Sequence, residues 1–167
     1  MDPGYRRVRY VRYADDFLIG TISDKAYAIQ LKSEISKFLS DNLHLRLNDE
    51  KTIITNAKQD KAKFLGFHIS KHPSSSIKIE MDVESLIRKL HQNGMCNEHG
   101  RPIGVAKLLP LPVNEIIKYG NQVLRGLLHS PQGCHNYYKG WRIQYIIHYS
   151  IAKTLARKFD ISMKLHL

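Results

Sequence analysis

The order of apolar and polar residues predicts a β-hairpin at the start of the chain. Polar and apolar residues roughly alternate from Tyr5 to Tyr13, and an apolar run resumes at Phe17 after two adjacent aspartates. A period of two is typical of strands, because successive side chains point to opposite faces. We therefore expect two short strands joined by a tight turn, with Asp15 and Asp16 at its tip.

The next segments predict one helix and three further strands. A helix is expected over residues 24–39, capped by Ser23, because four apolar side chains recur there at helical spacing: Tyr27, Leu31, Ile35 and Phe38. Alternation in LHLRLNDEKTIIT then predicts a strand over residues 43–47, a turn, and a strand over residues 52–55. The run KFLGFHI predicts another strand.

Only helical periodicity remains in the second half. It recurs over residues 82–93, from Pro112 to about residue 127, and from about Tyr137 to Phe159. Asn93 and Gly94 end the first of these helices, and Pro112 suits the start of the second. We therefore expect an α+β fold, with a mixed domain over residues 1–72 and a three-helix domain over residues 73–167.

The charge of the chain favours a polyanionic partner. Its 26 Lys and Arg exceed its 15 Asp and Glu, which gives a net charge of +11 and a pI near 9.7. Clustered cations attract phosphate backbones and release counterions, so nucleic acid is the leading class of partner. No apolar run approaches membrane-spanning length, and we expect no membrane partner.

Two cysteines, Cys96 and Cys134, argue against a secreted disulfide scaffold and favour a reducing compartment. His91 and His99 lie near Cys96, and His135 follows Cys134, which raises the question of zinc. A Cys-x2-His spacing is half a site, and structural zinc sites seldom use adjacent ligands. We therefore do not expect a zinc site.

Asp15 and Asp16 are the candidate metal ligands. Mg²⁺ prefers oxygen ligands, and a two-metal site can hold both the attacking and the leaving oxygen of a phosphoryl transfer. Taken alone, an Asp-Asp pair is more often a solvated turn. The flanking apolar strands and the motifs that follow in the sequence favour the metal interpretation.

Several motifs, in order, resemble those of one enzyme family. YADD (13–16), LRLNDEKT (45–52) and FLGFHI (64–69) resemble successive palm motifs of reverse transcriptases. IIKYGNQVLRGLLH (116–129) and YIIHYSIAKTLARKF (145–159) resemble the thumb, or X domain, of maturases encoded by group II introns. The resemblance covers almost the whole chain, and the joint occurrence of the motifs makes it specific.

The resemblance implies a truncated reverse-transcriptase palm followed by a helical thumb. It implies that Asp15 is the main magnesium ligand, Asp16 an auxiliary one, and that Lys51 lies near the nucleotide phosphates. A third aspartate comes from an earlier motif in this family, and Met1 stands only a few residues before the hairpin. We therefore expect the fingers and the third aspartate to be missing, and no DNA polymerisation by the isolated chain. The two aspartates are then either idle or completed by another polypeptide.

The long C-terminal helix is the main candidate for RNA binding. Cations bind phosphates and aromatic rings stack on unpaired bases, while an amphipathic core helix is the alternative for part of it. The residues expected to contact RNA are Arg125, Lys139, Trp141, Arg142, Tyr145, Tyr149, Lys153, Arg157 and Lys158. A second basic cluster consists of Arg6, Arg7, Arg9 and Arg12, for which a solvated strand edge is an equal alternative.

The expected function is RNA binding by a maturase-derived protein that helps a group II intron to fold and splice. RNA binding would need no cofactor, and magnesium would bind only if the palm is completed. Two alternatives stay open. The chain is a recruited structural component of a large ribonucleoprotein such as the mitochondrial ribosome, bound to ribosomal RNA, or it is the C-terminal half of a split reverse transcriptase, completed in trans by a fingers polypeptide. Richness in Ile and Lys and the lack of a presequence favour a mitochondrion over a plastid or a bacterial cytoplasm.

Overall fold

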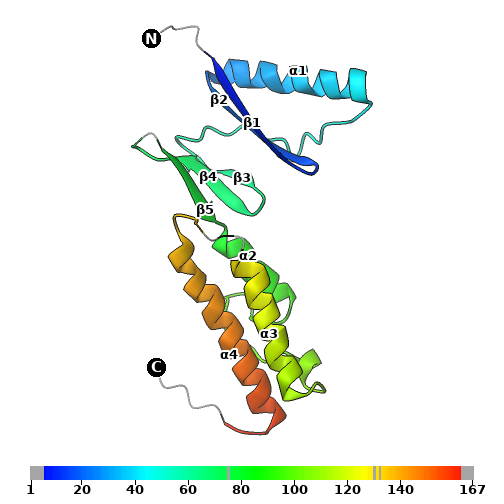
Figure 1. Cartoon of the computed structure of the whole chain (residues 1–167), viewed down its shortest axis with the longest axis vertical. Helices are drawn as coiled ribbons and strands as arrows, with labels where there is room; N and C mark the ends of the chain where they lie inside the picture. The colour runs from blue at the N-terminus through cyan, green and yellow to red at the C-terminus, as the bar shows by residue number, and fades with distance from the viewer. Residues whose placement is uncertain (1–5, 75, 130, 132, 163–167) are drawn as a thin grey trace. The chain divides into compact units, whose positions relative to one another are not determined.

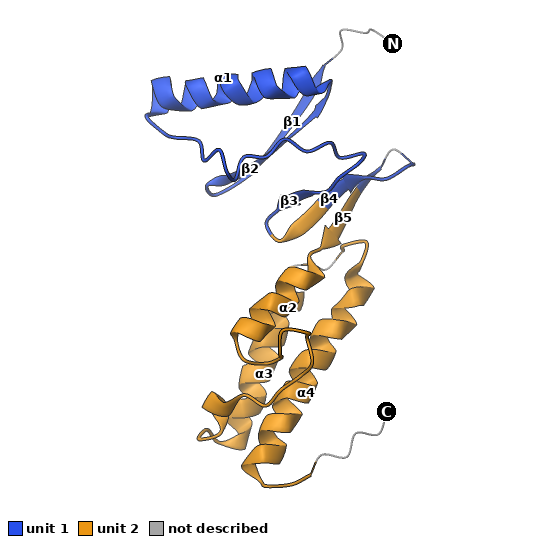
Figure 2. Cartoon of the chain, turned by 180° about the vertical axis from the view of Figure 1, so that it is seen from behind, with its two compact units in different colours: residues 1–65, 69–77 blue, residues 66–68, 78–167 orange. Residues whose placement is uncertain are grey.

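The computed structural model of the chain describes residues 6–74, 76–129, 131 and 133–162 (Figure 1). These residues form five β-strands in two sheets, four α-helices and two short 3-10 helices. This mixture confirms the predicted α+β class. The chain forms two compact units (Figure 2): unit 1 comprises Met1–Leu65 and Ile69–Ile77, and unit 2 comprises Gly66–His68 and Lys78–Leu167. The expected domain boundary after residue 72 stays a prediction.

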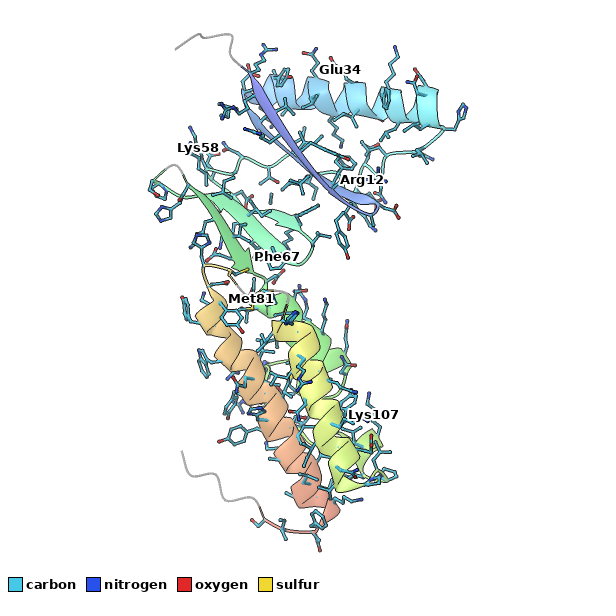
Figure 3. The ribbon with its side chains drawn as sticks, in the orientation of Figure 1. Arg12, Glu34, Lys58, Phe67, Met81 and Lys107 are labelled. Carbon is cyan, nitrogen blue, oxygen red and sulfur yellow. The ribbon has the colours of Figure 1, made fainter. Side chains whose placement is uncertain are left out.

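Unit 1 begins with the predicted hairpin. Strands β1 (Arg7–Tyr13) and β2 (Asp16–Ile22) pair antiparallel, with Tyr13 opposite Asp16, so the connecting loop has two residues. Ala14 occupies the first of them at a φ of 50°, a region that glycine adopts more readily. Nε of Arg12 donates a hydrogen bond of 2.7 Å to the carbonyl of Ala14 and holds the loop (Figure 3).

Helix α1 (Lys25–Leu43) follows the hairpin, and it differs from the prediction at both ends. Its cap is Asp24, not Ser23: the Asp24 carboxylate accepts a hydrogen bond of 2.8 Å from the backbone N–H of Tyr27, whereas the Ser23 hydroxyl lies 3.0 Å from that of Thr21. The helix ends at His44, whose φ of 52° reverses the chain. Of the four predicted inward side chains, Phe38 is instead 56% exposed.

The prediction of two strands, over residues 43–47 and 52–55, is wrong. Leu43 belongs to α1, and residues 44–48 and 52–56 carry no strand pairing. Alternating leucines satisfy the period of a strand, but no neighbouring strand takes up the backbone hydrogen bonds of this segment. The chain turns instead at Asn48, whose carbonyl accepts from the backbone N–H of Thr52 at 2.9 Å.

A second sheet has the strand order β3-β4-β5, formed by Ala62–Phe64, Phe67–Lys71 and Ile77–Met81. Leu65 and Gly66, both at positive φ, form the two-residue turn between β3 and β4, so the predicted single strand is a hairpin. Strand β5 was not predicted, because the Pro and Ser residues before it resemble a linker.

Unit 2 contains the three predicted helices: α2 (Val83–Gln92), α3 (Val113–Leu128) and α4 (Gly140–Lys158). The 3-10 helix η1 (Ala106–Leu108) lies in the loop between α2 and α3, and η2 (Tyr137–Lys139) leads directly into α4. Figure 1 shows α3 and α4 side by side. Asp82 caps α2 by accepting a hydrogen bond of 2.9 Å from the backbone N–H of Ser85.

The hydrophobic core lies in unit 2. Its buried side chains come from all three helices and from the loop before α3: Leu90, Met95, Cys96, Val105, Leu108, Ile116, Ile143, Ile146 and Ile147. Burying one such aliphatic side chain stabilises a fold by about 1.5–3 kcal/mol. None of the described residues of unit 1 is buried. The rigid scaffold for any functional surface is therefore unit 2.

The segment before α4 is fastened to β5. The side chain of Asn136 accepts from the backbone N–H of Met81 at 2.7 Å and donates to its carbonyl at 3.0 Å. The backbone N–H of His135 donates to the carbonyl of Ile79 at 2.9 Å. These bonds cover the strand edge and fix where α4 begins.

Candidate nucleic-acid interface

The two predicted metal ligands lie at the exposed tip of the β1–β2 hairpin. Asp15 is a loop residue and Asp16 begins β2, and both are exposed. Within the part of the chain that the structure describes, no group of three or more His, Cys, Asp or Glu is placed to hold a metal ion. The expected magnesium site needs a third carboxylate, so these residues do not fit a complete site, and we derive no chemical step from them.

Lys51 lies in an exposed turn that α1 anchors. Nζ of Lys32, on α1, donates to the carbonyl of Thr52 at 2.8 Å and lies 3.1 Å from the carboxylate of Asp49. The backbone N–H of Lys51 donates to the side chain of Asn48 at 3.1 Å, and the residue Lys51 is exposed. Its predicted role near nucleotide phosphates stays a prediction.

Arg6, just before β1, and the three arginines of β1 are divided between the two faces of the hairpin. Strand alternation places Arg7 and Arg9 on one face and Arg6 and Arg12 on the other. The guanidinium of Arg6 lies 4.5 Å from the ring centre of Tyr27 on α1, so the face of Arg6 and Arg12 is the one turned toward that helix. The cluster predicted from the sequence therefore amounts to two pairs.

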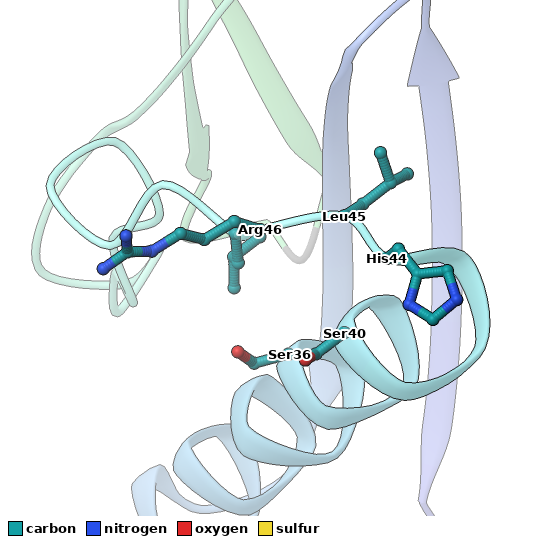
Figure 4. A pocket seen from close by; sticks show the side chains of 6 residues that line it. Ser36, Ser40, His44, Leu45 and Arg46 are labelled. Atoms are coloured by element: carbon teal, nitrogen blue, oxygen red, sulfur yellow. The ribbon is translucent and has the colours of Figure 1, made fainter.

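Unit 1 also has an open hollow of about 390 Å³ where α1 ends (Figure 4). It is lined by Ser36, Ser40, His44, Leu45, Arg46 and Leu47. The carbonyl ends of a helix carry partial negative charge, which opposes anion binding at this end. None of the predicted site residues lines the hollow.

Residues 116–159, which cover α4 and all of α3 except its first three residues, contain seven Lys and Arg and not one Asp or Glu. Glu115, in the first turn of α3, is the acidic residue just before this segment. The positive charges of such a segment repel one another, and a bound polyanion offsets this repulsion. The exposed side chains at its centre are aromatic: Tyr138 is 69% exposed and Trp141 is 62% exposed, with the exposed Lys139 between them. Cations around exposed rings suit phosphates and unpaired bases.

Tyr145 and Tyr149 continue the aromatic surface along α4. Their ring centres lie 4.4 Å apart, and the guanidinium of Arg142 lies 5.7 Å from the ring of Tyr145. Both tyrosines are half-buried, and their predicted contact with RNA stays a prediction.

Three of the predicted RNA-contacting cations also hold the loop between α2 and α3. Arg142 donates to the carbonyl of Gly100 at 3.2 Å, Lys153 to that of Pro102 at 2.9 Å, and Lys158 to that of Leu109 at 2.8 Å. Sequence reasoning missed this role. The available signal was the Gly- and Pro-rich composition of the loop, whose carbonyls lack partners in a regular element.

Arg157 and Arg125 are exposed, on α4 and α3 respectively. Among the aliphatic residues of α4, Ile146 and Ile147 are fully buried, while Ile151 and Leu155 are half-buried. The exposed cations and rings of the predicted site are therefore carried by helices whose other faces build the core.

The cysteines and their neighbouring histidines have separate structural contacts. Nδ1 of His91 lies 2.9 Å from the carbonyl of Cys96, His99 lies 3.4 Å from Glu98, and Nδ1 of His135 accepts from the backbone N–H of Ile79 at 3.1 Å. Burial raises the pKa of the Cys96 thiol, and the charge of Arg142 offsets part of that rise. Burial alone raises the pKa of Cys134.

None of the helices in the described residues is both long and apolar enough to cross a membrane. Helix α4 carries cations and the exposed ring of Trp141 and contains no Asp or Glu.

Two family models cover nearly the whole chain. The type II intron maturase model matches residues 74–166, and the reverse transcriptase (RNA-dependent DNA polymerase) model matches residues 2–69. The COX1/OXI3 intron 1 protein of Saccharomyces cerevisiae is 34% identical over 96% of this chain and 22% of its own length. The mitochondrial protein ymf11 of Marchantia polymorpha is 25% identical over 93% of this chain and 30% of its own length.

A bacterial relative is also similar over most of this chain and over a small part of its own length. The group II intron-encoded protein LtrA of Lactococcus lactis is 30% identical over 90% of this chain and 28% of its own length. The chain thus spans between about a fifth and a third of the length of these relatives. The maturase model covers more than half of the chain, including the whole acid-free segment 116–159. The chain belongs to the type II intron maturase family.

Proposed function

We propose that this chain binds the folded RNA of a group II intron and stabilises the conformation in which that RNA splices. The RNA supplies the chemistry, and the protein supplies charge and stacking surfaces. The observation that carries the proposal is the acid-free segment 116–159, with its exposed Tyr138 and Trp141 beside cations. Membership of the maturase family supports the same role.

The physical argument rests on what structured RNA offers. Its duplex regions present phosphates, and its loops present unpaired bases that stack on aromatic side chains. Exposed Lys139 and Arg157 on or beside α4 can neutralise phosphates, and Trp141 offers a flat ring to a base. Because the helix is held by the core, these groups need little ordering when RNA binds.

The proposed place of action is a mitochondrion. Its support is the similarity to the yeast intron protein and to the mitochondrial protein of Marchantia polymorpha. The proposed partner is intron RNA, with no metal or cofactor needed for binding. Magnesium binding at Asp15 and Asp16 would need a third carboxylate in addition to the described residues.

A binding assay with the purified chain tests this function. A group II intron transcript and a ribosomal RNA fragment of equal length are titrated over a range of salt concentrations. We expect the intron transcript to bind more tightly at every salt concentration, with an affinity that falls as salt rises. Equal affinity for both RNAs, or tighter binding of the ribosomal fragment, would overturn the splicing role.

A split reverse transcriptase is the second candidate, and one observation favours it. Val11, Tyr13 and Ile22 lie on the hairpin face opposite to Arg6, and they are 56%, 67% and 66% exposed. Exposed apolar side chains of this size mark a surface that a partner covers. Co-purification of the chain with a polypeptide that restores primer extension would support this candidate. If the mixture of the chain with its co-purified polypeptides extends no primer, this candidate is excluded.

A further inference from the structure

The turn at residues 97–101, between α2 and α3, is rigid and carries an exposed arginine. The side-chain oxygen of Asn97 accepts hydrogen bonds from the backbone N–H groups of His99 at 3.1 Å and Arg101 at 2.8 Å. The backbone N–H of Asn97 donates to the carbonyl of Arg101 at 2.9 Å. Arg101 is thus fixed in its backbone while its side chain faces solvent.

Helix α4 holds the turn on both sides of Arg101. Arg142 donates to the carbonyl of Gly100, the residue before it, and Lys153 donates to that of Pro102, the residue after it. A Cβ at Gly100 would lie 3.2 Å from the side chain of Ile87, so the turn also packs closely on α2. Two cations of α4 are therefore bonded to the residues on either side of the exposed Arg101.

No carboxylate neutralises these cations within the described residues, because Arg101, Arg142 and Lys153 take part in no ion pair there. The acidic residue of the turn, Glu98, lies beside His99 instead. Like charges held together destabilise a fold unless an anion offsets them. A guanidinium has five N–H donors and an ammonium has three, so each anchoring cation keeps donors for a ligand.

The neighbouring surface identifies which anion fits. Arg142 lies beside the ring of Tyr145, which lies 4.4 Å from the ring of Tyr149. A duplex hides its base faces, whereas an unpaired strand offers both phosphates and bases to a surface of this kind. The arrangement is therefore complementary to a single strand of RNA.

We propose that Arg101, Arg142 and Lys153 form a phosphate-binding site for an unpaired RNA strand, with the adjoining bases against Tyr145 and Tyr149. The inference rests on the proposed RNA-binding function and assigns the turn a part in it. Arg101 binds the phosphate directly, while Arg142 and Lys153 both hold the turn and contribute charge.

The test is the affinity of the full chain for a fluorescently labelled oligouridylate, with Arg101→Gln compared with Arg88→Gln. Both variants remove one exposed arginine of unit 2, but Arg88 lies on α2 and is not part of the turn 97–101. We expect Arg101→Gln to bind about fourfold more weakly at about 0.15 M salt, and to lower the slope of log affinity against log salt by about 0.7. Arg88→Gln should change neither quantity. Circular dichroism confirms that both variants are folded.

Equal affinities and equal salt slopes for the two variants would overturn this inference. If the wild-type chain still binds a group II intron transcript in that case, the proposed function stands and only the turn is excluded. A loss of affinity confined to duplex RNA would also overturn it, because the site is assigned to an unpaired strand. If the wild-type chain binds neither the transcript nor the oligouridylate, the proposed function and this inference both fail.

Discussion

Gly120 of α3 approaches Ile151 of α4 so closely that a Cβ at position 120 would lie 2.7 Å from Cγ1 of Ile151. Two carbon atoms cannot lie this close together, whereas the hydrogen atom of glycine fits. The packing of α3 against α4 therefore depends on glycine at position 120. We expect Gly120→Ala to lower the free energy of unfolding by about 1–3 kcal/mol, because the added methyl group forces the helices apart or displaces Ile151. Urea denaturation followed by circular dichroism measures this change.

Gly126 on the same helix provides the matched control. A Cβ there would meet nothing within 4 Å, and the residue is exposed. Gly126→Ala should therefore stabilise the chain by about 0.5–1 kcal/mol through helix propensity alone. Similar losses of stability in both variants would contradict the close approach of α3 and α4.

The side chain of Thr154 anchors the loop to α4 from within the core. Its Oγ1 accepts a hydrogen bond of 2.8 Å from the backbone N–H of Val105, and it is fully buried. Thr154→Val keeps the shape of the side chain but leaves that N–H unsatisfied. We therefore expect the free energy of unfolding to fall by about 1–3 kcal/mol. Thr154→Ser, which keeps the hydroxyl group, should cost less. Hydrogen exchange at the Val105 amide should accelerate only in the valine variant, and unchanged exchange would argue against the anchor.

Trp141 tests the stacking surface on α4. Because its side chain is 62% exposed, its removal should affect RNA binding more than folding. Stacking of one base on an aromatic ring contributes about 1–3 kcal/mol, so Trp141→Ala should weaken binding of a group II intron transcript by about 5- to 150-fold. Trp141→Phe should retain most of the affinity. An alanine variant that binds as the wild type does would remove Trp141 from the interface.

The two thiols predict how stability changes at alkaline pH. Burial raises the pKa of Cys96 and of Cys134, so the fold favours their protonated forms. This contribution is complete below the pKa of an unfolded cysteine, about 8.5, and is lost as the pH rises through the higher folded pKa. We expect the free energy of unfolding to fall over this window in urea titrations. Cys134→Ser should make the fall shallower, and an unchanged or steeper pH dependence would contradict the assignment.

The helical unit was largely predictable from the sequence. Apolar residues at helical spacing, the cap at Asp82 and the proline before α3 mark elements that carry their own signals. The loop between α2 and α3 was not predictable, because its shape depends on side chains of α4 such as Ser150, whose hydroxyl donates to the carbonyl of Ile103 at 2.7 Å. Contacts between residues about fifty positions apart leave no local pattern.

The first unit was predicted less well, for a related reason. The alternation through Leu45 and Leu47 is a local strand signal, but a strand also needs a neighbour, and the sequence does not say whether one is present. Strand β5 was missed because its polar approach resembles a linker. Among the candidate site residues, exposure of Lys139 and Trp141 fits their expected role, whereas the anchoring of Arg142, Lys153 and Lys158 required the structure.

The most direct test of the central claim is crosslinking of the native protein to RNA in the cells that make it, with sequencing of the attached fragments. The proposed function predicts that the crosslinks concentrate on one or a few group II introns, at unpaired segments, and that Trp141→Ala reduces them. Crosslinks that fall mainly on ribosomal RNA, or that are unchanged by this substitution, would contradict the account and favour a structural role in a ribonucleoprotein.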